Sequence, residues 1–412
     1  MVRFHMFSMI MIVVVSVLGP VTARSEAMNG QEGSYSFGDD VAFLKEHTDA
    51  FVLAKGASRI AVVPAYQGRV MTSTSGGDGG LSLGWVNRKL IASGTFEQHI
   101  NVFGGEDRFW LGPEGGQYAI FFAPDTEFTL DDWFTPAPID TEPYRLVRKH
   151  EDSALFRHDF ALKNKSGTPF QVSVDREVCL LDRTVATETV GMAIADGVSV
   201  VAYETRNCLT NRGDSAWKKE TGLLSIWILG MYNPSDRTTV AIPIRAGADD
   251  ELGYKVNDTY FGKIPAERLV VKDDILFFKG DGKQRGKLGV SPRRSKGVVG
   301  SYDAANRVLT VVWFNQPEDH VGYVNNMWEL QKEPYSGDAI MSYNDGPLGP
   351  GLPPLGPFYE LETSSPAVAL YPNESYTHVH RTIHLQGAEA DLDGIAKKLF
   401  GVGLETIKNA LK

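Results

Sequence analysis

The sequence contains only two cysteines, Cys179 and Cys208, among its 412 residues. Each lies in a strand-like run, so a disulfide between them and two buried free thiols both remain open. The sequence also lacks a phosphate-cradling glycine loop, a Gly-x-Ser-x-Gly elbow, a Cys-x-x-Cys pair and a dinucleotide fingerprint. These absences argue against kinases, serine hydrolases and Rossmann oxidoreductases.

Positive charge is in deficit, since 41 Lys and Arg residues against 51 Asp and Glu residues give a net charge of −10. This balance argues against a general nucleic-acid binder. Long apolar runs are also scarce, and the one from Met6 to Gly19 is too short to span a bilayer. Arg3 before it and small residues after it form a signal-peptide pattern. We expect residues 1–23 to be a signal peptide, the protein to be secreted or periplasmic, and no membrane span.

Short apolar segments separated by Gly, Pro and Asn turns fill most of the chain. Residues 154–162 and 170–181, for example, flank a turn cluster and predict a hairpin. We count about fourteen to eighteen such segments, which favours a mostly β fold of two large stacked antiparallel sheets. We expect one domain over residues 24–386. Apolar residues at helical spacing predict a helical tail over 387–412 that packs on the sandwich.

The segment 103–118, FGGEDRFWLGPEGGQY, mixes glycines, acids, an arginine and aromatic residues without apolar periodicity. Glycine permits close approach of the backbone, charged groups give directional hydrogen bonds, and tryptophan offers a flat apolar face. This mixture suits a polar ring-shaped ligand such as a sugar. The alternative is a glycine-rich loop held by its own salt bridges.

A late strand, 358–364, carries two carboxylates, Glu360 and Glu362, which share one face because strand side chains alternate. Two acids on one face are costly unless that face lines a wet cleft or makes paired hydrogen bonds. A carboxylate in a cleft is a competent general base. The alternative is an acidic strand that faces outward.

At this strand the chain resembles the galactose mutarotase-like superfamily, which includes the aldose 1-epimerases. Leu361-Glu362-Thr363, the turn at 372–374 and Ala65-Tyr-Gln-Gly-Arg69 are similar to motifs of that superfamily, and residues 103–118 resemble a segment of its secreted relatives. The resemblance covers roughly residues 50–386 and points to a functionally uncharacterised bacterial family. It implies a β-supersandwich of antiparallel strands with a sugar cleft on a concave face and Glu362 as the catalytic base.

The chain departs from the epimerases where their acid histidine stands, because Val174-Asp-Arg-Glu-Val178 has no histidine. His99, His158 and His378 are other candidates, and none matches by motif. Histidines 378, 380 and 384 share one strand face, for which we favour a polar outer face over a metal site. A basic run, 283–296, can hold an acidic sugar, although a solvated hairpin is the commoner reading.

We therefore expect an exported carbohydrate-active protein that binds a sugar in a cleft and isomerises, epimerises or cleaves it with a glutamate base. The alternatives are a non-catalytic glycan-binding protein and, less favoured, a metalloprotein using His378 and His380. No cofactor and no metal are expected, and the sugar, its linkage and the oligomeric state remain open. The candidate catalytic residues are Glu362, His99 and Arg108. The candidate substrate-binding residues are Arg69, Glu106, Trp110, Glu114, Trp328, Tyr335, Asn344 and Asp345.

Overall fold

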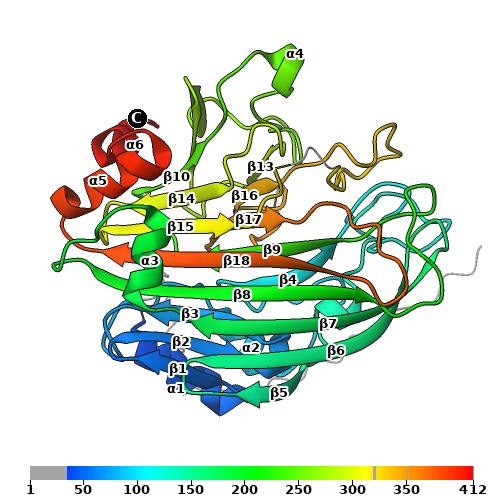
Figure 1. Cartoon of the computed structure of the whole chain (residues 1–412), viewed down its shortest axis with the longest axis horizontal. Coiled ribbons are helices and arrows are strands. Elements are labelled where there is room, and N and C mark those ends of the chain that lie inside the picture. Colours follow the sequence, from blue (N-terminus) through cyan, green and yellow to red (C-terminus); the bar gives the residue numbers. More distant parts are fainter. Residues whose placement is uncertain (1–34, 319–321, 350, 412) are drawn as a thin grey trace, which may run out of the picture. The chain divides into compact units, whose positions relative to one another are not determined.

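Antiparallel β-strands dominate the computed structural model, which describes residues 35–318, 322–349 and 351–411 (Figure 1). The mostly β fold predicted from the sequence is confirmed. The predicted signal peptide, residues 1–23, lies outside the described residues. Tyr35–Lys412 forms one compact unit.

The largest sheet crosses the whole unit and carries most of the long strands (Figure 1). Its ten strands lie in the order β11 (Leu269–Lys272), β12 (Ile275–Lys279), β10 (Thr238–Pro243), β14 (Val298–Asp303), β15 (Val308–Phe314), β18 (Ser375–Gln386), β8 (Ser199–Asn211), β7 (Pro169–Leu180), β6 (Ser153–Lys163) and β5 (Arg145–Lys149). The predicted hairpin of 154–162 with 170–181 is β6 and β7. Its turn closes because Thr168 N donates to Asn164 Oδ1 at 2.9 Å and Gly167 takes a φ of 86°.

Two smaller sheets complete the β-structure. The five-stranded sheet has the order β13 (Gly286–Val290), β16 (Ile340–Asn344), β17 (Tyr359–Ser364), β9 (Ser225–Tyr232) and β4 (Arg108–Gly112). The three-stranded sheet consists of β1 (Phe51–Lys55), β2 (Ser58–Val63) and β3 (Arg69–Thr74). Every residue of β9 and β17 is buried, so both faces of these central strands are covered.

The helices are short. They are α1 (Phe37–His47), α2 (Arg88–Ser93), α3 (Arg183–Val190), α4 (Asp249–Leu252), α5 (Glu389–Phe400) and α6 (Leu404–Asn409), with 3-10 turns η1 (Pro64–Tyr66) and η2 (Ala137–Ile139). The predicted C-terminal helices correspond to α5, which buries Leu392, Ile395 and Phe400, and α6, which buries Leu404 and Ile407. Both pack against the outer face of the ten-stranded sheet. No helix among the described residues is long and apolar enough to cross a membrane.

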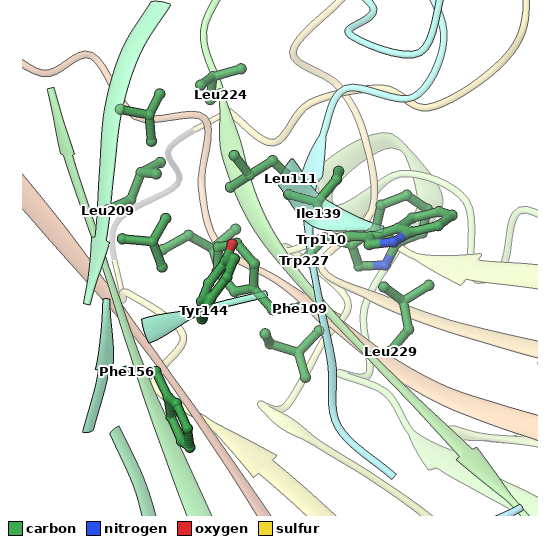
Figure 2. Packing of buried hydrophobic residues seen from close by; sticks show 14 of the residues in the cluster. Phe109, Trp110, Leu111, Ile139, Tyr144, Phe156, Leu209, Leu224, Trp227 and Leu229 are labelled. Carbon is green, nitrogen blue, oxygen red and sulfur yellow. The ribbon is translucent and has the colours of Figure 1, made fainter. Parts of the chain in front are cut away.

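The main core lies between the five-stranded and ten-stranded sheets. On β4, Phe109 and Leu111 belong to this core, together with Leu209 of β8. Figure 2 shows Trp110 and Trp227 on the opposite side of their strands from Tyr144 and Leu209. This alternation follows from the two-residue period of a strand, and it gives the five-stranded sheet a second, outward face.

The predicted polar outer face of the C-terminal strand is wrong. His378, His380 and His384 of β18 are at most 1% exposed and point between the sheets. Thr363 Oγ1 of β17 hydrogen-bonds His378 Nε2 at 2.8 Å and His380 Nδ1 at 2.9 Å. His384 Nε2 contacts Glu106 Oε2 at 2.9 Å. The error arises because period-two alternation groups residues on a face without saying which face is buried.

Acid is expected to destabilise the fold through two of these histidines. Burial lowers the pKa of His378 to about 3, helped by the neighbouring His380, and burial lowers the pKa of His380 to about 4. An unfolded histidine takes up a proton near pH 6.5, so below that pH the unfolded state binds more protons. Stability should therefore fall as the pH drops from about 6.5 to about 4, by up to about 1.4 kcal/mol per pH unit for each histidine.

Urea denaturation at several pH values measures this slope. We expect His378→Gln to flatten it, whereas His47→Gln, at an exposed position of α1, should leave it unchanged. An unaltered slope in His378→Gln would contradict the assignment.

The two cysteines are both free thiols. Cys179 of β7 lies opposite Glu204 of β8, while Cys208 lies four residues further along that strand. Four strand residues span about 13 Å, well beyond the Cα separation of about 7 Å that a disulfide permits. The strand register therefore decides between the two alternatives left open by the sequence, in favour of free thiols over a Cys179–Cys208 disulfide.

Candidate functional site

A pocket of about 390 Å³ opens over the outward face of the five-stranded sheet. Its aromatic lining residues are Trp110, Trp133, Trp227, Phe261, Trp328, Tyr343 and Phe358. Its charged or titratable lining residues are His99, Arg108, Glu114, Asp131, Arg285, Lys287 and Glu360. A mainly apolar pocket with a few convergent polar groups is the usual form of a small-molecule site.

Strand register brings these residues together from distant parts of the chain. Arg108 of β4 lies opposite Leu229 of β9, and Leu229 lies opposite Glu362 of β17. In the next row of the same face, Glu360 lies opposite Tyr343, and Tyr343 lies opposite Lys287 of β13. Alternation therefore places one cation from each edge strand and the two carboxylates of β17 on a common surface.

Two buried ion pairs join these rows. Arg108 Nη2 contacts Glu360 Oε1 at 3.1 Å, and Lys287 Nζ contacts Glu362 Oε2 at 3.1 Å. Trp227 Nε1 also donates to Glu362 Oε2 at 2.9 Å. Glu360 is 4% exposed and lines the pocket, whereas Glu362 is 0% exposed and lies behind it. Of the two carboxylates, only Glu360 lines the pocket.

Burial raises the pKa of Glu360, and the Glu362 carboxylate raises it further, against the opposing effect of Arg108. A raised pKa keeps a proton on Glu360 above the range in which an ordinary glutamate loses it. Burial likewise raises the pKa of Glu114. A carboxyl group that retains its proton toward neutral pH is suited to act as a general acid.

Both cations of the ion pairs stack on indoles. The Arg108 guanidinium carbon lies 4.2 Å from the ring centre of Trp110, and Lys287 Nζ lies 4.6 Å from that of Trp227. Stacking fixes a cation and limits its hydration. Arg108 Nε and Nη1 and Trp110 Nε1 are buried without a hydrogen-bond partner among the described residues. The floor of the pocket therefore holds donors that the described protein leaves without an acceptor.

The walls of the pocket come from loops. His99 Nδ1 lies 2.6 Å from the carbonyl oxygen of Trp133, and because a carbonyl only accepts, Nδ1 carries the proton. In a neutral imidazole this leaves Nε2 as the acceptor. Trp328 Nε1 donates to Glu114 Oε1 at 3.1 Å, and the Trp328 ring lies 5.8 Å from that of Trp133.

The glycines of residues 103–118 make room for protein rather than for a ligand. A Cβ at Gly105, whose φ is 105°, would lie 2.6 Å from Arg69 Cδ. A Cβ at Gly115 would lie 2.2 Å from the carbonyl oxygen of Met327. The close approach of the two chain segments at Gly115 allows Asn326 Oδ1 to accept a hydrogen bond from Glu114 N at 2.8 Å. This bond holds the Trp328 loop against the pocket.

The pocket brings together five of the residues predicted from the sequence: His99, Arg108, Trp110, Glu114 and Trp328. Glu362 contacts this group through Lys287 and Trp227 without lining the pocket. The early segment 103–118 and the late strand β17, some 250 positions apart, thus meet at one hollow, as the sugar hypothesis requires.

The remaining predicted site residues lie elsewhere and have protein partners. Arg69 donates to the carbonyl oxygen of Gly104 at 2.9 Å, and Glu106 accepts from Tyr203 at 2.9 Å between the sheets. The ring of Tyr335 stacks on Tyr118, Asn344 Oδ1 accepts from Gly282 N, and Asp345 accepts from the Tyr343 hydroxyl. None of these five side chains lines the pocket.

Several pocket residues were not predicted as site residues. Glu360 was noted only as sharing a face with Glu362, and the same alternation identifies it. Lys287 and Arg285 belong to the basic run 283–296, whose composition alone does not tell which residues face inward. Trp133, Trp227 and Phe358 have no local signal, because ordinary core residues show the same pattern.

Within the described ranges, no group of three or more His, Cys, Asp or Glu side chains is arranged to hold a metal ion. His378 and His380, which suggested a metal pair, both bond to Thr363 instead.

Residues 35–411 of the chain match the family of unknown function DUF6786. No curated protein matches the sequence. Among solved structures, the chain is similar to the Slr1438 protein from Synechocystis sp. PCC 6803, with 12% identity, a TM-score of 0.48, and coverage of 83% of this chain and 96% of that one.

The chain is also similar to a galactose mutarotase-like protein from Lactobacillus casei ATCC 334, with 7% identity, a TM-score of 0.47, and coverage of 82% of this chain and 100% of that one. A galactose mutarotase related enzyme from Lactobacillus acidophilus gives 8% identity, a TM-score of 0.46, and coverage of 82% and 97%. The names of these two Lactobacillus proteins agree with the galactose mutarotase-like superfamily that the sequence resembles.

Proposed function

This chain belongs to the family of unknown function DUF6786, and we propose that it binds a carbohydrate in the pocket over β4, β9 and β17. The observation that carries the proposal is the contact of 3.1 Å between Arg108 Nη2 and the Glu360 carboxyl group, set among indole rings on the floor of that pocket. Indoles cover the apolar faces of a sugar ring, and charged groups bind its hydroxyls. The solved structures named as mutarotase-like agree with a sugar ligand.

We further propose that the protein isomerises, epimerises or cleaves its sugar by proton transfer, with Glu360 as the proton-bearing group. Glu362, which is bound by Lys287 and Trp227, would then act on Glu360 as a positioning residue. His99 Nε2 is the second candidate for proton transfer, since Nδ1 is committed to a carbonyl. A panel of mono- and oligosaccharides followed by NMR tests this activity, and no change in any sugar would refute it.

A non-catalytic glycan-binding protein is the second candidate. The full burial of Glu362 favours it, because the glutamate that aligns with the epimerase base does not reach the pocket. This candidate predicts saturable binding in calorimetry without turnover by NMR.

Trp328→Ala is expected to weaken sugar binding by about tenfold or more, because stacking of an aromatic face is worth on the order of 1 kcal/mol or above and Trp328 also holds Glu114. Trp328 is only half-buried, so the variant should still fold. Calorimetric titration with the best ligand of the panel measures the change. The matched control is Trp313→Ala, in β15 beside Arg381, away from the pocket. Equal loss in both variants would remove Trp328 from the site.

We also propose export, supported by the signal-like pattern of residues 1–23. Mass spectrometry of the protein from culture medium or periplasm would find an N-terminus near Arg24.

A further inference from the structure

Three Arg and Lys side chains line the pocket, and Arg285 differs from the other two. Arg108 and Lys287 each contact a carboxylate, whereas no described carboxylate lies within 4.0 Å of Arg285. Its guanidinium carbon instead lies 3.7 Å from the ring centre of Phe261. Arg285 Nε is buried and has no hydrogen-bond partner among the described residues. The pocket thus holds a cation whose charge the described protein leaves unpaired.

Arg108 adds further donors on the floor of the same pocket. Its side chain is 3% exposed, and one nitrogen, Nη2, reaches Glu360. Nε and Nη1 have no hydrogen-bond partner among the described residues, so two of the three guanidinium nitrogens keep donors without an acceptor. Buried donors without acceptors cost free energy, and a ligand that supplies acceptors recovers that cost. A carboxylate fits best, because its oxygens accept hydrogen bonds and its charge is opposite to that of a guanidinium.

We propose that the carbohydrate bound in this pocket carries a carboxylate, as a uronic acid does, and that Arg285 and the unpartnered donors of Arg108 receive it. The inference rests on the proposed carbohydrate binding and narrows its ligand class. Lys287 is not part of this site, since Glu362 already neutralises it. The volume of about 390 Å³ is at the small end of the range for ligand pockets and suits a small saccharide.

The other carboxyl groups that line the pocket do not oppose this assignment strongly. Burial raises the pKa of both Glu360 and Glu114, which reduces the negative charge that an incoming carboxylate meets. Asp131 is exposed, so water screens its charge.

The test compares sugars that differ only in the charged group. Calorimetric titration of the unaltered protein with D-glucuronate and D-galacturonate should give dissociation constants at least about tenfold lower than with D-glucose and D-galactose. Equal affinities would overturn the carboxylate assignment and leave sugar binding intact. Absence of binding by all four would refute the proposed function together with this inference. Tighter binding of D-glucose 6-phosphate than of either uronate would replace the carboxylate by a phosphate.

A variant then tests whether Arg285 is the residue that binds the carboxylate. Arg285→Gln should reduce the preference for uronate over neutral sugar by about tenfold. Arg293→Gln is the matched control, because Arg293 is exposed in the same basic run and donates to the carbonyl oxygen of Glu251. Thermal melts confirm that both variants fold. A preference that survives in Arg285→Gln would remove Arg285 from the site.

Discussion

Replacing Glu360 with glutamine is expected to lower turnover of a sugar substrate by about 10²–10⁴-fold, the usual contribution of a general acid or base. The carboxyl group lines the pocket, lies 3.1 Å from the Arg108 guanidinium, and keeps its proton above the ordinary range because burial raises its pKa. Glutamine has the same shape and can still accept a hydrogen bond from Arg108, so substrate affinity should change much less than turnover. NMR of the sugar conversion and calorimetry measure the two quantities separately.

The pH dependence gives this prediction a second readout. If the protonated form of Glu360 is the active one, kcat/KM falls as the pH rises through its raised pKa. That alkaline limb should disappear in Glu360→Gln and persist in Glu333→Gln, an exposed control. Full turnover in Glu360→Gln would contradict the role of Glu360. Glu362→Gln would then be the next variant, because Glu362 is the only other β17 carboxylate on that face.

Much of the fold was predictable from the sequence because it depends on local alternation. The β6–β7 hairpin, the central strands and the C-terminal helices all follow from apolar spacing and turn residues that act within a few positions. Strand β4 was missed, since Arg108–Gly112 lies in a glycine-rich segment without periodicity. Its burial is set by pairing with β9, more than a hundred positions later, and single-sequence patterns do not contain such contacts.

The candidate site was predictable only in part, for a related reason. The segments 103–118 and 358–364 could be recognised as unusual from their charged residues. Strand register determines which of their side chains meet. On β17 the shared face of Glu360 and Glu362 was correct, but the depth of each side chain depends on Lys287 and Trp227, which come from other strands. Glu106 lies two residues before Arg108 yet points between the sheets, where it bonds Tyr203 and His384.

Replacing Arg176 with methionine is expected to lower the free energy of unfolding by about 3–5 kcal/mol, because it leaves a buried carboxylate without its cation. Arg176 of β7 and Asp107, just before β4, are both 0% exposed, and their charged atoms lie 2.5 Å apart. Thr205 also donates to the Asp107 carboxylate at 3.0 Å. This ion pair ties the ten-stranded sheet to the residue that precedes Arg108, so the same contact fixes one edge of the pocket.

Urea denaturation measures the loss, and the double variant Arg176→Met, Asp107→Leu separates its causes. With both charges removed, the unpaired carboxylate no longer exists, so the double variant should be more stable than Arg176→Met alone. The matched control is Asp175→Asn, which breaks the partly exposed Arg157–Asp175 pair on the neighbouring strands and should cost less than about 1 kcal/mol. A similar small cost for Arg176→Met would mean that packing alone, without this pair, holds β4 against the large sheet. The position of Arg108 would then depend on its own partner, Glu360, and on Trp110.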